Sequence, residues 1–236
     1  AGLARGGLRL GLKKGLAEGT EAGVRREARS AVTQNPHAVA RAHKEKVCVD
    51  DRSTSRPDEW SCRKPISLPG SLPLLFTRTF ESSYRAGRWF GVSWASTLDQ
   101  RLEIDAEGVV FIDADGSILA YPHPAPNVPV LPGHGRRWPL DRTLDGYTVT
   151  DPESGHVRRF SLDGRLVQVD DRNGAWIVYD YDGDGVPTGI RHSGGYELRI
   201  DTEEGRVIRL SLGDGTRILD YRYDEGQPHR SHQLLR

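Results

Sequence analysis

The feature that most constrains this chain is a glycine that returns at a nearly fixed interval through its C-terminal part. Gly164, Gly185, Gly205 and Gly226 are separated by 21, 20 and 21 residues, and each directly follows an acidic residue. Glycine permits the positive φ of a tight turn, and acidic side chains hydrogen-bond the turn backbone. Alternating stretches such as AWIVYDYD and TRILDYRYD lie between these turns. The period therefore predicts units of two strands and two turns, which bury an apolar face only by pairing with one another.

Shorter strand-like stretches precede the repeat. We expect strands at 72–80, 97–104, 109–113, 118–121 and 147–150. In the second of these, Leu98, Leu102 and Ile104 share a face. Asp115-Gly116 predicts a two-residue hairpin turn between the third and fourth. Residues 122–139 contain six prolines and predict an irregular surface loop, because proline cannot donate to a central ladder.

The N-terminal segment has a different composition. Residues 1–47 carry ten basic and four acidic residues, and glycines recur there every four positions from Gly7 to Gly23. The spacing would align these glycines on one face of a helix, but glycine destabilises helices and the segment is strongly charged. Both a short helix and a disordered basic tail remain open. Any binding of this tail to nucleic acid or anionic lipid would be nonspecific.

The composition limits the function classes. Lys plus Arg equals Asp plus Glu at 33 each, so the whole-chain charge gives no reason to expect a specific nucleic-acid partner. An apolar fraction of 36% with 27 glycines is typical of a turn-dense β protein. There is no run of 18 apolar residues, so we expect no membrane span. Cys48 and Cys62 are too few to establish a disulfide, and the absence of methionine suggests a fragment or a processed product.

Several stretches resemble the Rhs, or YD-repeat, polymorphic toxin family. Its repeat unit reads roughly Y-D-x-x-G-x-L-x-x-I, and Tyr179-Asp180-Tyr181-Asp182 and Tyr221-Arg222-Tyr223-Asp224 carry this pattern best. Asp170 through Gly174 is similar to the D-R-N-G element between early repeats. Leu68-Pro69-Gly70, Leu72-Pro73-Leu74 and Gly91 through Trp94 look like the domain that precedes the repeats. The resemblance covers about residues 66–226.

The resemblance implies a structural role. In Rhs proteins the repeats coil into a hollow β shell around a C-terminal toxin domain that is released by self-cleavage. We therefore expect a non-catalytic fragment of such a shell, with the rest of the shell and the enclosed toxin as partners. The parent protein would be secreted or displayed on the cell surface and would act in bacterial competition. Asp151-Pro152-Glu153-Ser154-Gly155 only superficially resembles the family's cleavage motif, D-P-x-G-L, and predicts a turn.

Two stretches depart from the family pattern. For residues 52–66 and 227–236, codons can be chosen that encode an amino-acid sequence resembling the family when the reading frame is shifted by one nucleotide. We hypothesise that the reading frame slips near residue 51, recovers near 67 and slips again near 226. The chain would then be a frameshifted or truncated fragment, and its coding DNA tests this hypothesis.

These observations predict a mainly β fold, an antiparallel hairpin array of about 20-residue YD repeats forming part of a spiralling shell, with a short helical or disordered N-terminal segment. The expected divisions are a basic segment at 1–47, an irregular linker at 48–66, a β-rich domain at 67–160, YD repeats at 161–226 and a tail at 227–236.

No residue set predicts a catalytic, cofactor or metal site. Asp180, Asp182, Asp184 and Gly185 imitate the opening of a calcium loop, but Arg191 stands where the bidentate Glu belongs. The eight histidines lack zinc spacing, and neither a serine-nucleophile motif nor a phosphate-binding loop is present. Two alternatives to the shell remain. One is a carbohydrate or cell-surface binding module that uses Tyr and Trp faces. The cluster Gly87-Arg88-Trp89-Phe90-Gly91 could stack on a sugar, but such aromatics more often pack in a core. The other is a toxin enzyme, for which the toxin domain is absent.

Overall fold

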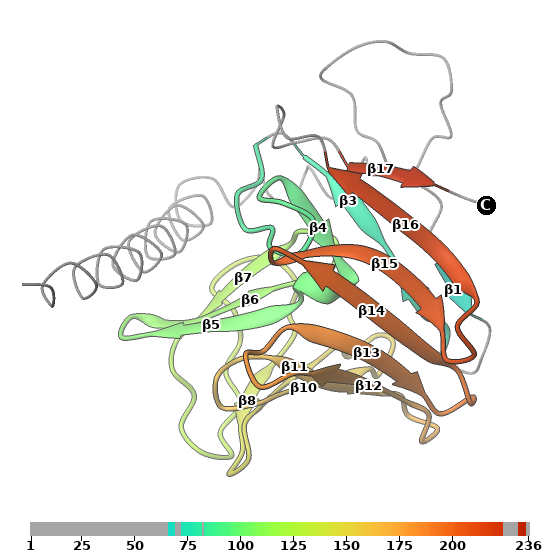
Figure 1. Cartoon of the computed structure of the whole chain (residues 1–236). Coiled ribbons are helices and arrows are strands. Elements are labelled where there is room, and N and C mark those ends of the chain that lie inside the picture. The colour runs from blue at the N-terminus through green and yellow to red at the C-terminus, as the bar shows by residue number, and fades with distance from the viewer. Residues whose placement is uncertain (1–65, 69–71, 82, 224–230, 235–236) are drawn as a thin grey trace, which may run out of the picture.

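The computed structural model describes residues 66–68, 72–81, 83–223 and 231–234 (Figure 1). Within these ranges the chain is mainly β, with seventeen strands and a single short 3₁₀ helix, η1. The expectations for residues 1–47, for most of 48–66 and for the cysteines lie outside the described residues. The strands before the repeat region are β1 (Ile66–Leu68), β2 (Leu74–Phe76), β3 (Arg78–Phe80), β4 (Trp94–Ser96), β5 (Arg101–Asp105), β6 (Gly108–Ile112) and β7 (Ile118–Tyr121).

The larger part of the fold is one sheet of ten strands, each antiparallel to the next in chain order. Its strands are β8 (Leu140–Arg142), β9 (Tyr147–Thr150), β10 (Val157–Phe160), β11 (Leu166–Asp170), β12 (Trp176–Tyr181), β13 (Pro187–His192), β14 (Glu197–Glu203), β15 (Arg206–Leu212), β16 (Arg217–Tyr223) and β17 (Ser231–Leu234). The expected antiparallel hairpin array is therefore confirmed. Pairing continues across residue 160, because β10 pairs with β11.

Turn glycines at both ends of the sheet set the spacing of its strands. Gly164, Gly185 and Gly205 lie at one end and Gly174, Gly195 and Gly215 at the other, and all six have positive φ. Each 20-residue unit thus contains two strands, as the period predicted. At most of these turns three residues lie between the last hydrogen-bonded pair of the two strands, and the glycine is the third of them. At Gly185, for example, the N–H of Asp182 donates to the carbonyl of Val186, and the N–H of Gly185 donates to the carbonyl of Asp182.

The turn at Gly116 has the same form, which corrects one sequence expectation. Gly116 N donates to Asp113 O, and Asp113 N donates to Ser117 O. Three residues therefore lie between the hydrogen-bonded Asp113 and Ser117 in this hairpin, rather than the two that Asp115-Gly116 suggested. Glycine takes the left-handed position that follows a type I turn, a combination about as compatible with strand twist as the two-residue turn.

The sheet has one apolar and one charged face. The apolar face carries the buried side chains that alternate along the strands, among them Ile177, Ile190, Leu198 and Leu210. The opposite face carries cross-strand ion pairs: Arg159 with Asp170, Arg191 with Asp180, and Arg209 with Asp220. Ion pairs of this kind stabilise a sheet only weakly, but their charged side chains keep its outer face polar. The apolar face must be covered.

Residues 72–121, here called the inner block, cover the apolar face. The block contains the small sheets β3–β4 and β5–β6–β7, and strand β2, which pairs with β1. The strand expected at 72–80 is divided at Thr77, whose N–H donates to the Thr97 hydroxyl. The strand expected at 97–104 is wrong in its first part, because Thr97–Asp99 forms η1 with Ser96 as its N-cap. Leu98 and Leu102 are nevertheless both buried, and Ile104 packs against the core cluster to which they belong.

The proline-rich segment 122–139 closes one edge of the large sheet. It contains no strand, as expected, but it follows β8 closely. Val130 and Leu140 exchange backbone hydrogen bonds of 2.8 and 2.9 Å, and Asn127 N donates to Arg142 O. Proline offers no N–H for a further strand to bind, so this segment ends the sheet at β8. At the opposite edge the last strand is β17.

Two turn glycines with almost the same φ provide a matched stability test. Gly164 has φ +87° and Gly215 has φ +88°, but a Cβ at Gly164 would lie 2.1 Å from Leu102 O whereas one at Gly215 meets nothing within 4 Å. Gly215→Ala should lower the free energy of unfolding by about 1–2 kcal/mol, the cost of a left-handed L-residue. Gly164→Ala should cost about 3 kcal/mol or more, because overpacking adds to that strain. Denaturant unfolding measures both, and equal losses would contradict the close contact between β5 and this turn.

Candidate functional site

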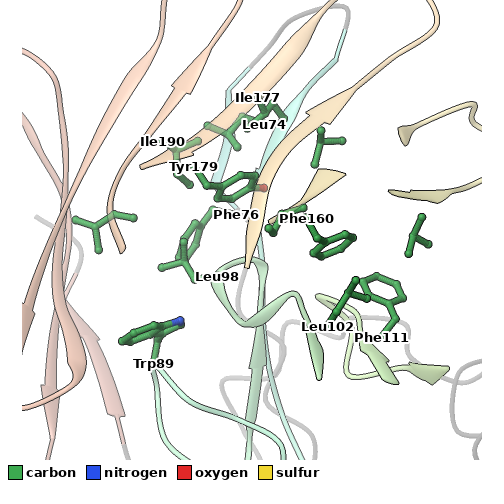
Figure 2. Close-up of a cluster of buried hydrophobic side chains, with 14 of the residues drawn as sticks. Leu74, Phe76, Trp89, Leu98, Leu102, Phe111, Phe160, Ile177, Tyr179 and Ile190 are labelled. Atoms are coloured by element: carbon green, nitrogen blue, oxygen red, sulfur yellow. The ribbon is translucent and has the colours of Figure 1, made fainter. Parts of the chain in front are cut away.

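The surface that organises this molecule is the contact between the inner block and the apolar face of the large sheet. Figure 2 shows Leu98, Leu102 and Phe111 of the block lying opposite Phe160 and Tyr179 of the sheet. All five belong to one continuous buried cluster. Phe111 and Phe160 meet edge to face, with ring centroids 5.7 Å apart. The volume beside this face of the sheet is therefore filled by side chains of the same chain.

Backbone hydrogen bonds fix the position of the block on the sheet. Leu102 N donates to Gly164 O at 2.8 Å, and Val207 N donates to Trp89 O at 2.9 Å. The buried His192 adds a third link from its Nε2 to Leu72 O. Because Nδ1 of the same ring accepts from Gly194 N, Nε2 must carry the proton, and the neutral ring satisfies both contacts. These bonds are directional, so they set the register of the two layers as well as holding them together.

Arg78 joins the block to the far strands of the sheet. Its guanidinium lies 4.2 Å from the ring centroid of Trp94, 4.7 Å from Tyr221 and 5.2 Å from Phe90, and the residue is 6% exposed. A planar cation stacks on such faces, and desolvation strengthens the attraction. Tyr221 belongs to β16, so this contact attaches the start of the block to the end of the repeat array.

Asp99 organises the loop that precedes β4. Its carboxylate accepts from the backbone N–H groups of Arg88 and Trp89 and from the Ser96 hydroxyl. The residue is almost fully buried, and desolvation raises its pKa above the ordinary carboxyl value, against the opposing effect of these hydrogen bonds. Ser96-Thr97-Leu98-Asp99 has the Ser-x-x-acid pattern of a helix start, which could have indicated this turn from the sequence.

A second polar group attaches the proline-rich segment. Arg136 bridges the carboxylates of Asp113 and Asp115 in the β6–β7 turn. Two guanidinium groups lie over the Trp138 ring, that of Arg136 at 4.9 Å and that of Arg158 at 4.6 Å from the ring centroid. Burial raises the pKa of Asp113, while Arg158 and Arg136 act in the opposite direction. The arginines and carboxylates here face one another, as in a structural clamp.

The calcium-like acidic residues do not converge. Asp182 Oδ1 accepts from the backbone of Asp184 and Val186 within the turn. Asp180 lies on the outer face and forms a two-bonded ion pair with Arg191. Throughout the described ranges, no three His, Cys, Asp or Glu side chains are grouped so as to hold a metal ion. The turn interpretation of this motif is therefore the one that the geometry supports.

The aromatic cluster and the cleavage-like stretch are also structural. Trp89 and Phe90 are buried in the main core, as the packing interpretation expected. Asp151 begins a turn in which Gly155 N donates to its carbonyl and its side chain accepts from Glu153 N. Hydrogen bonds from Ser154 and the turn backbone outweigh desolvation and hold the pKa of Asp151 below its usual range.

The histidines are not brought together. His192 is buried, whereas His123 and His134 are exposed and His156 is half-buried. His123 Nε2 lies 2.7 Å from the backbone oxygen of Asp105. The histidines at 37, 43 and 229 lie outside the described residues.

No helix in the described part of the chain is long and apolar enough to cross a membrane.

The comparisons with known proteins concern the inner block. Residues 63–121 match a family described as Domain of unknown function (DUF6531). The match begins inside the stretch 48–66 and ends with β7, so it covers the inner block and about a quarter of the chain. No curated protein matches the chain. What is shown is that the segment covering the sheet is similar to a recurring domain whose function is not known.

The stacked arginine allows a direct test of the contact between block and sheet. Arg78→Lys should lower the free energy of unfolding by about 2 kcal/mol, because a compact ammonium cannot stack on three rings in a desolvated site. Arg88→Lys is the matched control. Arg88 stacks on Trp89 at 4.7 Å and is exposed, so its replacement should cost less than about 0.5 kcal/mol. Chemical denaturation compares the two variants, and similar losses would contradict the role of the stack.

Two carboxylates should show opposite pH dependence. Burial raises the folded-state pKa of Asp99, so its contribution to stability is present in acid and is lost as pH rises through the raised value. Backbone hydrogen bonding from Thr216 lowers the pKa of Asp214, so its contribution is present above the ordinary carboxyl value and is lost as pH falls through the lowered value.

The measured quantity is the free energy of unfolding of the wild type minus that of the Asn variant, followed from acid to neutral pH. We expect this difference to fall with rising pH for Asp99→Asn and to rise for Asp214→Asn. A difference that rises with pH for both variants would show that Asp99 is not held in the desolvated environment described.

Proposed function

We propose that this chain is a non-catalytic segment of a toxin-enclosing β shell of the Rhs, or YD-repeat, kind. The observation that carries the proposal is the uninterrupted ladder of ten antiparallel strands, laid down in chain order with turn glycines at both ends. Such a ladder lengthens by adding units of the same kind, which is the behaviour of a repeat scaffold. In this proposal the partners are further strands of the shell and an enclosed C-terminal toxin domain, and the parent protein is secreted or displayed on the cell surface.

The two edges of the sheet differ, and this difference supports the addition of further strands at the β17 edge alone. At β8 the proline-rich segment occupies the edge through Val130 and Asn127. At the other end β17 pairs with β16 through residues such as Gln233 and Tyr221, and it is the last strand of the ladder. An unpaired strand edge binds other strands readily. In the proposed shell the proline-rich segment closes the first edge and the following repeats continue from the other.

The alternatives receive less support from the side chains. A carbohydrate module would present flat aromatic faces to solvent, but every Phe, Tyr and Trp among the residues whose burial is described is buried or half-buried. A toxin enzyme would need convergent catalytic groups. The buried acids Asp99 and Asp113 instead bind backbone, hydroxyl and arginine partners in the fold. Selective binding on a glycan array, or growth arrest on expression of the chain, would favour one of these alternatives.

Association through the β17 edge, where the described strands of the sheet end, tests the shell proposal. We expect the isolated chain to associate as its concentration rises, with poor solubility at the upper end. Hydrogen exchange with mass spectrometry, on dilute and concentrated samples, should show new protection in β17 (Ser231–Leu234) and none in β8 (Leu140–Arg142). A monodisperse monomer that melts cooperatively over the whole concentration range would contradict the proposal, and so would new protection at the β8 edge.

A further inference from the structure

The turn between β11 and β12 contains a reactive pair that the scaffold role does not use. Asn173 and Gly174 are exposed residues in this turn, and Gly174 has φ +83°. An asparagine followed by glycine is open to attack on its side-chain amide by the next backbone nitrogen, because glycine has no Cβ to obstruct the approach. The local hydrogen bonds decide whether that nitrogen is available.

The Gly174 N–H differs from the N–H groups at the equivalent turn positions. Gly116, Gly164, Gly185 and Gly215 each donate to the carbonyl three residues earlier, at 2.8 to 3.1 Å. Within the described ranges, the Gly174 N–H has no hydrogen-bond acceptor, although its neighbours Asn173 and Ala175 both donate to Asp171. A Cβ placed on Gly174 would meet nothing within 4 Å, so the space around the nitrogen is open.

The other two asparagines of the chain lack these features. Asn35 precedes Pro36, which has no N–H to lose. Asn127 precedes the β-branched Val128, whose N–H donates to Ala125 O at 3.0 Å. Sequence and hydrogen bonding therefore distinguish Asn173 from both.

We propose that Asn173 is a site of spontaneous deamidation in the folded protein. The Gly174 nitrogen bonds to Cγ of Asn173, the Cγ–Nδ2 bond breaks, and Nδ2 leaves as ammonia with the proton of the Gly174 N–H. Water then opens the five-membered imide at either carbonyl carbon and gives aspartate or isoaspartate. The reaction consumes one water, releases one ammonia and involves no oxidation or reduction.

The reaction would weaken the connection between β11 and β12. Asn173 Nδ2 lies 3.5 Å from Asp171 Oδ2, so the product places a carboxylate where an amide now faces an ionised acid. Isoaspartate also adds one backbone carbon to a connection whose length fixes the register of the hairpin.

Timed incubation of the full chain at mildly alkaline pH, followed by peptide mapping with mass spectrometry and an isoaspartate assay, tests the proposal. We expect Asn173 to convert to a mixture of aspartate and isoaspartate while Asn127 remains an amide. Gly174→Ala should slow the conversion several-fold, because the methyl group obstructs the attack. Gly195→Ala is the matched control, since Gly195 has φ +85° and an equally open position but no adjacent asparagine, and it should leave the rate at Asn173 unchanged.

Three results would overturn the proposal: equal rates at Asn127 and Asn173, an unchanged rate in Gly174→Ala, or an Asn173 that is stable in the native protein and reacts only in denaturant. A slower rate in Gly195→Ala equal to that in Gly174→Ala would also count against it, because the effect would then come from general strain in the turns.

Discussion

Contact between the inner block and the apolar face of the ten-stranded sheet is the constraint on which the rest of the structure depends. A sheet with alternating side chains has one face that water disfavours, and here Phe160, Ile177 and Ile190 belong to that face. The inner block supplies Leu98, Leu102 and Phe111 against it. Those side chains form one continuous buried cluster with the sheet, so the contact is mainly apolar.

The polar residues add direction to this apolar contact. Apolar packing alone tolerates sliding, whereas the bond from Leu102 N to Gly164 O permits one register. The Arg78 stack extends the attachment to β16, and the clamp around Arg136 holds the proline-rich segment on the opposite side. The two ends of the sheet are thus attached to the same block.

The sequence predicted the features that depend on local geometry. Turn glycines and alternation determine strand spacing without reference to the rest of the chain, so the hairpin array, the irregular proline-rich segment and the burial of Trp89 and Phe90 could be expected. The strand expected at 97–104 was wrong at its start because the hydrogen bonds of Ser96 and Asp99 outweigh strand propensity there. The sequence did not reveal the positions of Arg78 and Arg158, since their partners lie far along the chain and no local pattern encodes them.

Native-state hydrogen exchange at low denaturant tests the central claim most directly. If the block and the sheet form one cooperative unit, the amides of Leu102 and Val207, which bond across the contact, should open with the same free energy as Ile190 and Leu198 inside the sheet. That free energy should equal the global free energy of unfolding. Opening of Leu102 and Val207 at a clearly lower free energy, with the sheet still protected, would contradict the account, because the sheet would then not depend on the block that covers it.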